Sequence, residues 1–187
     1  MKQPNKLLFL ISLLLVTIAC GRSPQDAPKE PEQMDIPRSE AGGRSPEDAR
    51  KELEQLDIPY SETSFLERVK GNDPVAVELF LDAGMNPDVM NASGITPLMI
   101  AAEDGYTGMA KVLIDADADV NARNERGATA LIIAAFKGHA ETTKVLINAG
   151  ADMDIKTKEN GMTALMIAEK MKHTEIVEIL GQDGAKE

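Results

Sequence analysis

The sequence GITPL at residues 94–98 returns as GATAL at residues 127–131 and as GMTAL at residues 161–165. The first interval is 33 residues and the second is 34. Alanine follows each copy at a fixed distance, in the pairs Ala101-Ala102, Ala134-Ala135 and Ala168-Glu169. A period of this length predicts structural units that stack on one another, because one unit cannot bury its apolar face alone.

Each unit is predicted to contain two helices. In the first copy, Thr96 can cap the first helix and Pro97 can start it, since proline has a φ suited to the first helical position. Gly105 and Gly138 lie where this helix ends and a positive φ is needed. The second helices carry apolar pairs at Val112-Leu113, Val145-Leu146 and Ile179-Leu180.

These spaced positions resemble ankyrin repeats, in which a β-turn precedes two antiparallel helices. The resemblance implies an all-α repeat solenoid of about four repeats, with limits near 61–91, 92–124, 125–157 and 158–187. The first repeat lacks the Thr-Pro-Leu signature, although Asp73-Pro74 marks the start of its second helix. Its expected core residues are Thr63, Phe65, Leu66, Val69, Leu79, Phe80, Leu81 and Gly84.

The chain also departs from the family pattern. The histidine that usually follows Thr-Pro-Leu is replaced by Met99, Ile132 and Met166. The hydrogen bonds that it makes between neighbouring turns are therefore expected to be absent or replaced, with apolar packing in their place. His139 and His173, which follow the ends of first helices, are expected to pack and form hydrogen bonds.

The last repeat differs in a way that suits the end of a stack. It has Lys172 instead of the turn glycine and Glu169 instead of the second alanine. A terminal repeat needs a polar outer face, so we expect this repeat to be the C-terminal cap.

A segment before the repeats is duplicated. Residues 22–40 (RSPQDAPKEPEQMDIPRSE) recur with most positions identical at residues 44–62 (RSPEDARKELEQLDIPYSE). The second copy is predicted to form a helix from Pro46 to Leu56, with Ser45 as its N-cap and with Ala49, Leu53 and Leu56 at helical spacing. Within a segment 44–60, this helix would cover the apolar side of the first repeat.

The first copy is not expected to form that helix. It has Pro28 and Pro31 where the second copy has Arg50 and Leu53, and an interior proline costs a helix about 3 kcal/mol. With their Pro, Gly, Ser and charged residues, residues 20–43 are expected to be a disordered tether. The first copy is interpreted either as a spacer or as a motif that binds a partner.

The N-terminus is typical of an export signal. Lys2 and Lys6 precede an uncharged apolar run from Leu7 to Ala19, which is too short for an ordinary membrane span. Cys20 follows Ala19 in an arrangement that resembles the lipobox of bacterial lipoproteins, so residues 1–19 are predicted to be a signal peptide and Cys20 the site of lipid attachment. Thr17 stands where the lipobox usually has Leu, which leaves ordinary secretion as the alternative.

The composition excludes several classes of partner. The formal net charge is −11, and it would become −13 if Lys2 and Lys6 were removed with the leader. Such a charge argues against nucleic acid and against anionic membrane surfaces. Cys20 is the single cysteine, so no intramolecular disulfide can form. We expect a monomer that touches the membrane through a lipid anchor alone.

No pattern in the sequence predicts catalysis or a cofactor. Asp115, Asp117 and Asp119 alternate like the opening of a calcium loop, but Val120 and Arg126 occupy the positions that need Gly and Glu. A Gly-rich phosphate loop, a nucleophile elbow and an HExxH-type metal motif are all missing. We therefore expect no enzyme activity, no metal and no cofactor.

The family resemblance implies that a protein partner binds the concave face, which is made by the turn tips and the first helices. The residues expected to point outward there are Ser93, Ile95, Glu103, Asp104, Arg123, Glu125, Arg126, Ala128, Phe136, Lys137, Lys156, Asn160, Met162 and Lys170. Phe136 is either an exposed binding residue or partly buried against the next repeat. Arg123, Arg126, Lys137 and Lys156 suggest either a positive strip for an acidic partner or scattered surface charge.

Three functions are compatible with these features. The first is a tethered adaptor or inhibitor of an extracytoplasmic protein, located in the bacterial cell envelope. The second is a structural envelope spacer, or a soluble secreted ankyrin protein if Cys20 carries no lipid. The third is an enzyme or small-ligand binder, which would need a deep pocket.

Overall fold

The computed structural model describes residues 44–183, and within this range the regular structure is entirely helical. The helices are α2 (Pro46–Gln55), α3 (Glu62–Lys70), α4 (Pro74–Asp82), α5 (Pro97–Asp104), α6 (Thr107–Asp115), α7 (Ala130–Lys137), α8 (Ala140–Asn148), α9 (Ala164–Met171) and α10 (Thr174–Asp183). Residues 1–19, Cys20 and the expected tether lie outside the described residues.

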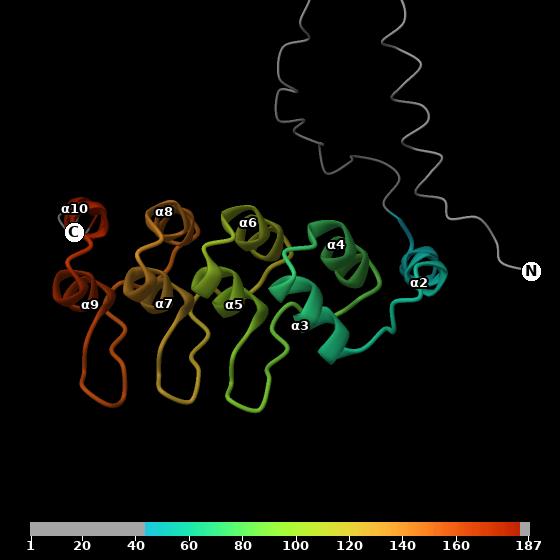
Figure 1. The fold of residues 1–187 in the computed structure, drawn as a ribbon, viewed down its shortest axis with the longest axis horizontal. Helices are drawn as coiled ribbons and strands as arrows, with labels where there is room; N and C mark the ends of the chain where they lie inside the picture. The colour runs from blue at the N-terminus through green and yellow to red at the C-terminus, as the bar shows by residue number, and fades with distance from the viewer. Residues whose placement is uncertain (1–43, 184–187) are drawn as a thin grey trace, which may run out of the picture. The chain divides into compact units, whose positions relative to one another are not determined.

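The helices from α3 onward form two parallel rows (Figure 1). The inner row contains α3, α5, α7 and α9, and the outer row contains α4, α6, α8 and α10. Each inner helix packs on the outer helix of its own repeat and on the inner helix of the next repeat. This is the predicted all-α repeat solenoid.

Three of the inner helices begin and end in the same way. The hydroxyl groups of Thr96, Thr129 and Thr163 accept hydrogen bonds from the backbone N–H groups three residues later, at 3.3, 3.4 and 3.4 Å. Each helix ends on a residue in the left-handed conformation, which is Gly105, Gly138 or Lys172. Threonine caps and left-handed ends thus set the length of these helices.

Aliphatic side chains and alanines fill the core between the rows. Leu98, Leu131, Leu113 and Leu146 are buried, and so are both alanines of the pairs at residues 101–102 and 134–135. Alanine brings two helices close together without leaving a gap, so a core with few aromatic residues is still well packed. Met99 and Ile132 are buried as well, which confirms apolar packing at two positions of the missing histidine.

The last repeat does not follow the prediction of apolar packing at the positions of the missing histidine. Met166 occupies the third position of the missing histidine, but its side chain is 48% exposed. Met171 is also exposed, at 40%. No repeat follows within the described residues, so nothing there covers these two side chains.

The first repeat is less regular than its sequence predicts. Ser61 caps α3 by accepting from the N–H of Ser64 at 3.2 Å, whereas the expected core residue Thr63 is exposed within the helix. Gly84 is exposed too, and Leu66 and Leu81 are only half-buried. The other expected core residues of this repeat, Phe65, Val69, Leu79 and Phe80, are buried.

The helix α2 packs against the outer helix α4 (Figure 1). Ala49 and Leu53 are fully buried as predicted, but Leu56 is 54% exposed, because the helix has already ended there. Ile58 supplies the third buried side chain instead. Tyr60 completes the contact: its hydroxyl group donates to the carbonyl oxygen of Ala83 at 3.1 Å.

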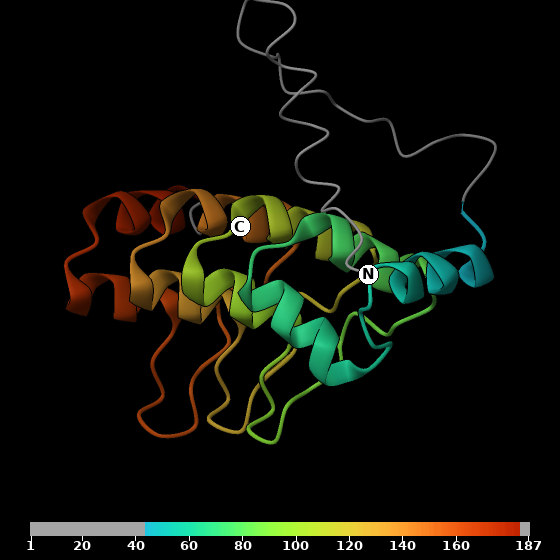
Figure 2. The same cartoon turned by 45° about the vertical axis from the view of Figure 1, so that its right-hand side comes forward.

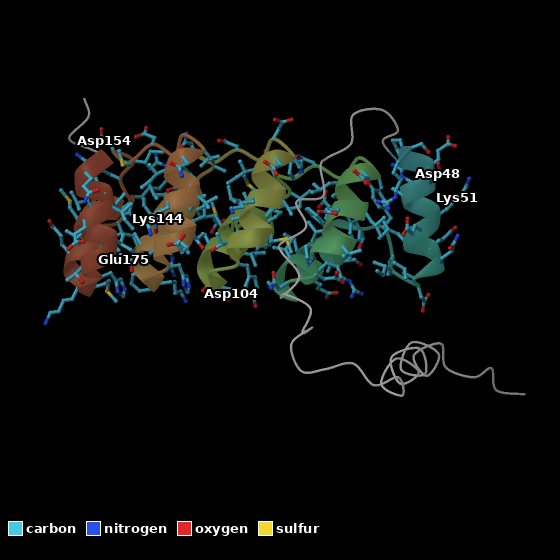
Figure 3. The ribbon with its side chains drawn as sticks, turned by 90° about the horizontal axis from the view of Figure 1, so that it is seen from above. Asp48, Lys51, Asp104, Lys144, Asp154 and Glu175 are labelled. Carbon is cyan, nitrogen blue, oxygen red and sulfur yellow. The ribbon has the colours of Figure 1, made fainter. Side chains whose placement is uncertain are left out.

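An ion-pair network joins two neighbouring outer helices. Lys144 of α8 lies 2.6 Å from Glu141 of the same helix and 3.5 Å from Glu175 of α10 (Figure 3). The hydrogen bond to Glu141, together with the attraction of Glu141 and Glu175, raises the pKa of the Lys144 ammonium group above its ordinary value.

Among residues 44–183, no helix has the length and apolar character needed to cross a membrane.

Candidate functional site

Three hairpin loops extend from one side of the inner row (Figure 2). The first, second and third hairpins are residues 91–95, 124–128 and 157–162, each closed by a hydrogen bond between its end residues at 3.0–3.1 Å. We call the surface made by these hairpins and the exposed side of the inner helices the inner face.

Side-chain hydrogen bonds fix the shape of the first two hairpins. The side-chain oxygen of Asn91 accepts from the N–H groups of Ser93 and Ile95, and that of Asn124 accepts from those of Arg126 and Ala128. An asparagine side chain that accepts from the backbone two residues later stabilises a turn. The hairpins are therefore a preformed part of the inner face.

Backbone hydrogen bonds also connect one hairpin to the next. The N–H of Glu125 donates to the carbonyl oxygen of Ser93 at 3.5 Å, and the N–H of Lys158 donates to that of Arg126 at 2.9 Å. Neighbouring turns are therefore joined through their backbones. The three hairpin tips thus form one continuous edge.

The structure gives Arg123 a structural role that the sequence did not reveal. Its guanidinium group donates to the carbonyl oxygen of Gly127 at 3.3 Å and to that of Lys156, in the next repeat, at 2.7 Å. These bonds hold the second and third hairpins together. Arg123 is therefore a structural residue of the inner face, although its side chain reaches the surface.

Two of the four basic residues considered for a positive strip have acidic partners. Lys137 pairs with Glu103 at 2.9 Å, and Arg126 lies 3.8 Å from Glu159. Each of these pairs joins neighbouring repeats across the inner face. The surface around these two pairs therefore carries both signs of charge.

Most of the residues expected on the concave face are exposed. These are Ser93, Glu103, Asp104, Arg123, Glu125, Arg126, Phe136, Lys137, Lys156, Asn160 and Lys170. Ile95 and Met162 are half-buried. The expectation for Ala128 is wrong: it is only 9% exposed, because it lies between the turn and the start of α7.

Phe136 is the large apolar side chain that the inner face exposes on α7. Its exposed fraction is 49%, which places it on the surface rather than in the core. Its carbonyl oxygen accepts from Nε2 of His173, in the next repeat, at 3.2 Å. The backbone that carries the phenyl ring is therefore held in place by two repeats.

His139 makes the equivalent bond one repeat earlier. Its Nε2 donates to the carbonyl oxygen of Glu103 at 3.0 Å. Both histidines thus pack and form hydrogen bonds, as their position predicted. Each ring lies against the glycine that ends the preceding inner helix, where a Cβ atom would come within 3 Å of it.

The model of the ankyrin-repeat family, which spans three copies of the repeat, matches residues 66–157 and again residues 116–187. The chain belongs to the ankyrin-repeat family. No curated protein matches the sequence. Ankyrin repeats act as protein–protein interaction modules, and the inner face of this ankyrin-repeat protein is its candidate binding surface.

Asp119, one of the three aspartates that alternate like a calcium loop, forms hydrogen bonds within the repeat loops. Asp119 accepts from the N–H of Asn121 at 2.9 Å, and its own N–H donates to Asp88 of the preceding repeat, also at 2.9 Å. Within the described part of the chain, no three His, Cys, Asp or Glu side chains are grouped so that they could hold a metal ion.

One part of the inner face was not predicted from the sequence. A hollow of about 350 Å³ lies between α3 and the first hairpin, and Leu66, Met90 and Ala92 contribute to its lining. The missing Thr-Pro-Leu signature of the first repeat was the signal that could have revealed it, since a repeat without that turn leaves the next hairpin uncovered.

Proposed function

We propose that this protein is a lipid-anchored, extracytoplasmic ankyrin-repeat protein that binds a partner protein on its inner face and acts as an adaptor or inhibitor. The observation that carries the proposal is the exposed Phe136 on a rigid part of that face. Exposed aromatic side chains and arginines are typical of the residues that dominate binding energy in protein interfaces.

Rigidity supports this assignment. The backbone at Phe136 is fixed by His173, and the neighbouring Lys137 is held by Glu103. A side chain presented on a fixed backbone loses little conformational entropy on binding, so more of the contact energy contributes to affinity.

Arg126 is the second residue of the proposed centre. Its side chain is 80% exposed and its pairing with Glu159 is long, at 3.8 Å. An exposed pair of this kind contributes at most about 1 kcal/mol, so Arg126 can exchange its partner for a carboxylate of a bound protein.

The proposed location rests on the N-terminal sequence. A basic start, an apolar run and Cys20 after Ala19 support export and lipid attachment. An anchored chain would hold its repeats at the membrane surface, where an adaptor or inhibitor meets envelope proteins.

The double variant Phe136→Ala with Arg126→Ala tests the binding centre. A partner captured from envelope extract by crosslinking and identified by mass spectrometry should bind the double variant at least about thirtyfold more weakly. The control Val75→Ala with Lys111→Ala removes an exposed apolar and an exposed basic residue of the outer helices, and it should retain affinity. Equal affinity of the double variant and the unmodified chain would contradict the proposal.

Stability measurements separate binding from folding. Changing the buried Leu146 to Ala should lower the free energy of unfolding by about 2–5 kcal/mol, because a cavity opens in the core. Phe136→Ala should cost far less. If both changes lower the unfolding free energy equally, Phe136 is a core residue and the proposed centre is wrong.

A further inference from the structure

The hollow beside the first hairpin has an apolar floor and a charged rim. Leu66 and Ile100 contribute apolar surface from α3 and α5, and Met90, which is 50% exposed, contributes from the hairpin side. Glu62, Thr63, Glu67 and Lys70 line it along one side of α3.

The hairpin edge next to this hollow is open. In the second and third hairpins, the N–H groups of Glu125 and Lys158 donate to the hairpin before them. The equivalent group of the first hairpin is the N–H of Ala92, and among residues 44–183 it has no acceptor. The first repeat has no hairpin that could supply one, as α3 carries no such loop in Figure 2.

A carbonyl group on the same edge is also without a hydrogen bond in the described part of the chain. The carbonyl oxygen of Lys156 accepts from Arg123 of the preceding repeat, and the equivalent oxygen of Met90 has no donor within the described range. A C=O and an N–H two residues apart on one edge can pair with a residue of an added extended segment. The first hairpin therefore offers an unused pairing edge beside an apolar hollow.

The charges at the hollow select among extended segments. Glu62 and Glu67 are both exposed and flank Leu66, while Lys70 lies further along α3. A basic side chain next to the segment's apolar residue would meet the two carboxylates, and an acidic one would be repelled there.

We propose that this end of the inner face binds an extended segment of the partner protein, which carries one apolar side chain next to an Arg or Lys. The apolar side chain enters the hollow between Leu66 and Met90. The segment's backbone pairs with the N–H of Ala92 and the C=O of Met90, and its basic residue meets Glu62 and Glu67. The inference rests on the proposed function and specifies one element of the partner.

A peptide pool can probe this site directly. Its members are seven-residue peptides with a central Leu, Met or Phe, an Arg or Lys one or two residues away, and Gly or Ser elsewhere. Added to the isotope-labelled full chain, they should bind saturably and shift the NMR signals of the Ala92 amide and the Met90 methyl group. A matched pool with Glu in place of Arg or Lys should bind more weakly.

The variant Ala92→Pro tests the backbone pairing. Ala92 is the second residue of a turn closed by the bond from the N–H of Gly94 to the C=O of Asn91, at 2.9 Å, and proline is favoured at that position. The substitution removes the unpaired N–H of Ala92 and breaks no hydrogen bond of the described fold. Affinity for the peptide pool should therefore fall about three- to tenfold, while the melting temperature should not change.

A second variant tests the charges. Glu62→Gln with Glu67→Gln should weaken binding of the basic pool about three- to fivefold at low salt, and less at high salt. Glu178→Gln, an exposed glutamate of α10, is the control and should leave binding unchanged.

Three results would overturn the proposal: no binding by any member of the basic pool, binding that is unaffected by Ala92→Pro, or slow hydrogen exchange of the Ala92 amide in the free chain. The last would mean that another segment of this chain already occupies the edge. Capture of a partner that depends on Phe136, without binding of the pool, would overturn this inference but leave the proposed function intact.

Discussion

At the scale of the residue, backbone contacts between repeats decide which side chains are permitted. His173 lies against Gly138, whose φ is +88°, and an added Cβ atom would come within 2.8 Å of the imidazole ring. The corresponding position of the last repeat is Lys172, also left-handed at φ 61°, and no further repeat among the described residues places a histidine ring against it. Gly138 thus meets two requirements, a left-handed φ and room for the histidine ring, whereas only the left-handed φ applies at Lys172.

Gly138→Ala should lower the free energy of unfolding more than Gly150→Ala does. Both glycines have a left-handed φ, but a Cβ atom at Gly150 meets no atom within 4 Å. The shared backbone strain is of order 1 kcal/mol or more, and the clash with His173 should add about 1–3 kcal/mol. Urea unfolding of the two variants measures the difference, and equal midpoints would show that the ring moves aside freely.

At the scale of the element, α2 shows how a duplicated sequence forms a helix in one copy. Leu53 is fully buried, and Arg50 lies 4.7 Å from the centre of the Tyr60 ring while its Nε donates to the C=O of Ala83. The first copy has Pro28, Pro31 and Arg38 at the positions of Arg50, Leu53 and Tyr60. It therefore lacks the side chains that attach α2 to the first repeat.

The double variant Arg50→Pro with Leu53→Pro makes the second copy resemble the first. It should abolish α2 and lower both the helical circular dichroism and the urea midpoint, because each interior proline costs about 3 kcal/mol of helix stability. Glu47→Gln, which also introduces the residue of the first copy, is exposed and should change stability by no more than about 0.5 kcal/mol. A double variant with unchanged protection of residues 44–60 from proteolysis would contradict the prediction.

The pairing of α8 with α10 through Lys144 should contribute a small, pH-dependent stabilisation. The pKa of Lys144 is raised above 10.5 in the folded chain, so the contribution is present at neutral pH and is lost as the pH rises above that value. Lys144→Gln should therefore lower the melting temperature at pH 7 and low salt, and the difference should shrink at high salt and at a pH above the raised pKa of Lys144. Lys111→Gln is the matched control, since Lys111 occupies the equivalent position of α6 and has no ion pair among the described side chains.

At the scale of the whole molecule, the described chain is a stack in which each repeat contacts its neighbours. Stability of such a stack is close to a sum over repeats and their interfaces, so the ends are its weakest parts. The N-terminal end is covered by α2 on the outer row alone, and the C-terminal end exposes Met166 and Met171. At each end of the described stack, surface is exposed because the terminal repeat lacks a full neighbouring repeat on one side.

The proposed anchor can be tested on the full chain in a bacterial host. Cys20→Ala should move the protein from the membrane fraction to the soluble fraction, because the thiol that would carry the acyl chains is removed. Thr17→Leu, which brings the segment closer to the usual lipobox, should stay with the membrane. Unchanged fractionation of Cys20→Ala would contradict the lipid anchor.

The sequence by itself determined the repeat. The spacing of Thr96, Thr129 and Thr163, the alanine pairs and the left-handed helix ends are local signals, because caps and turns depend on residues a few positions apart. Ala49 and Leu53 were placed correctly for the same reason. The N-terminal end of α2 was predictable from Ser45 and Pro46, since capping acts within one helical turn.

Only the tertiary structure decided how the inner face is composed. Arg123 links two hairpins, Ala128 is buried, and Arg126 and Lys137 have acidic partners in adjacent repeats. The open edge at Met90 and Ala92 likewise follows from a hairpin that the first repeat lacks. Such features depend on which residues lie together about 33 positions apart in the chain. A local pattern cannot fix them, because a hydrogen bond or ion pair between repeats requires the stack to form first.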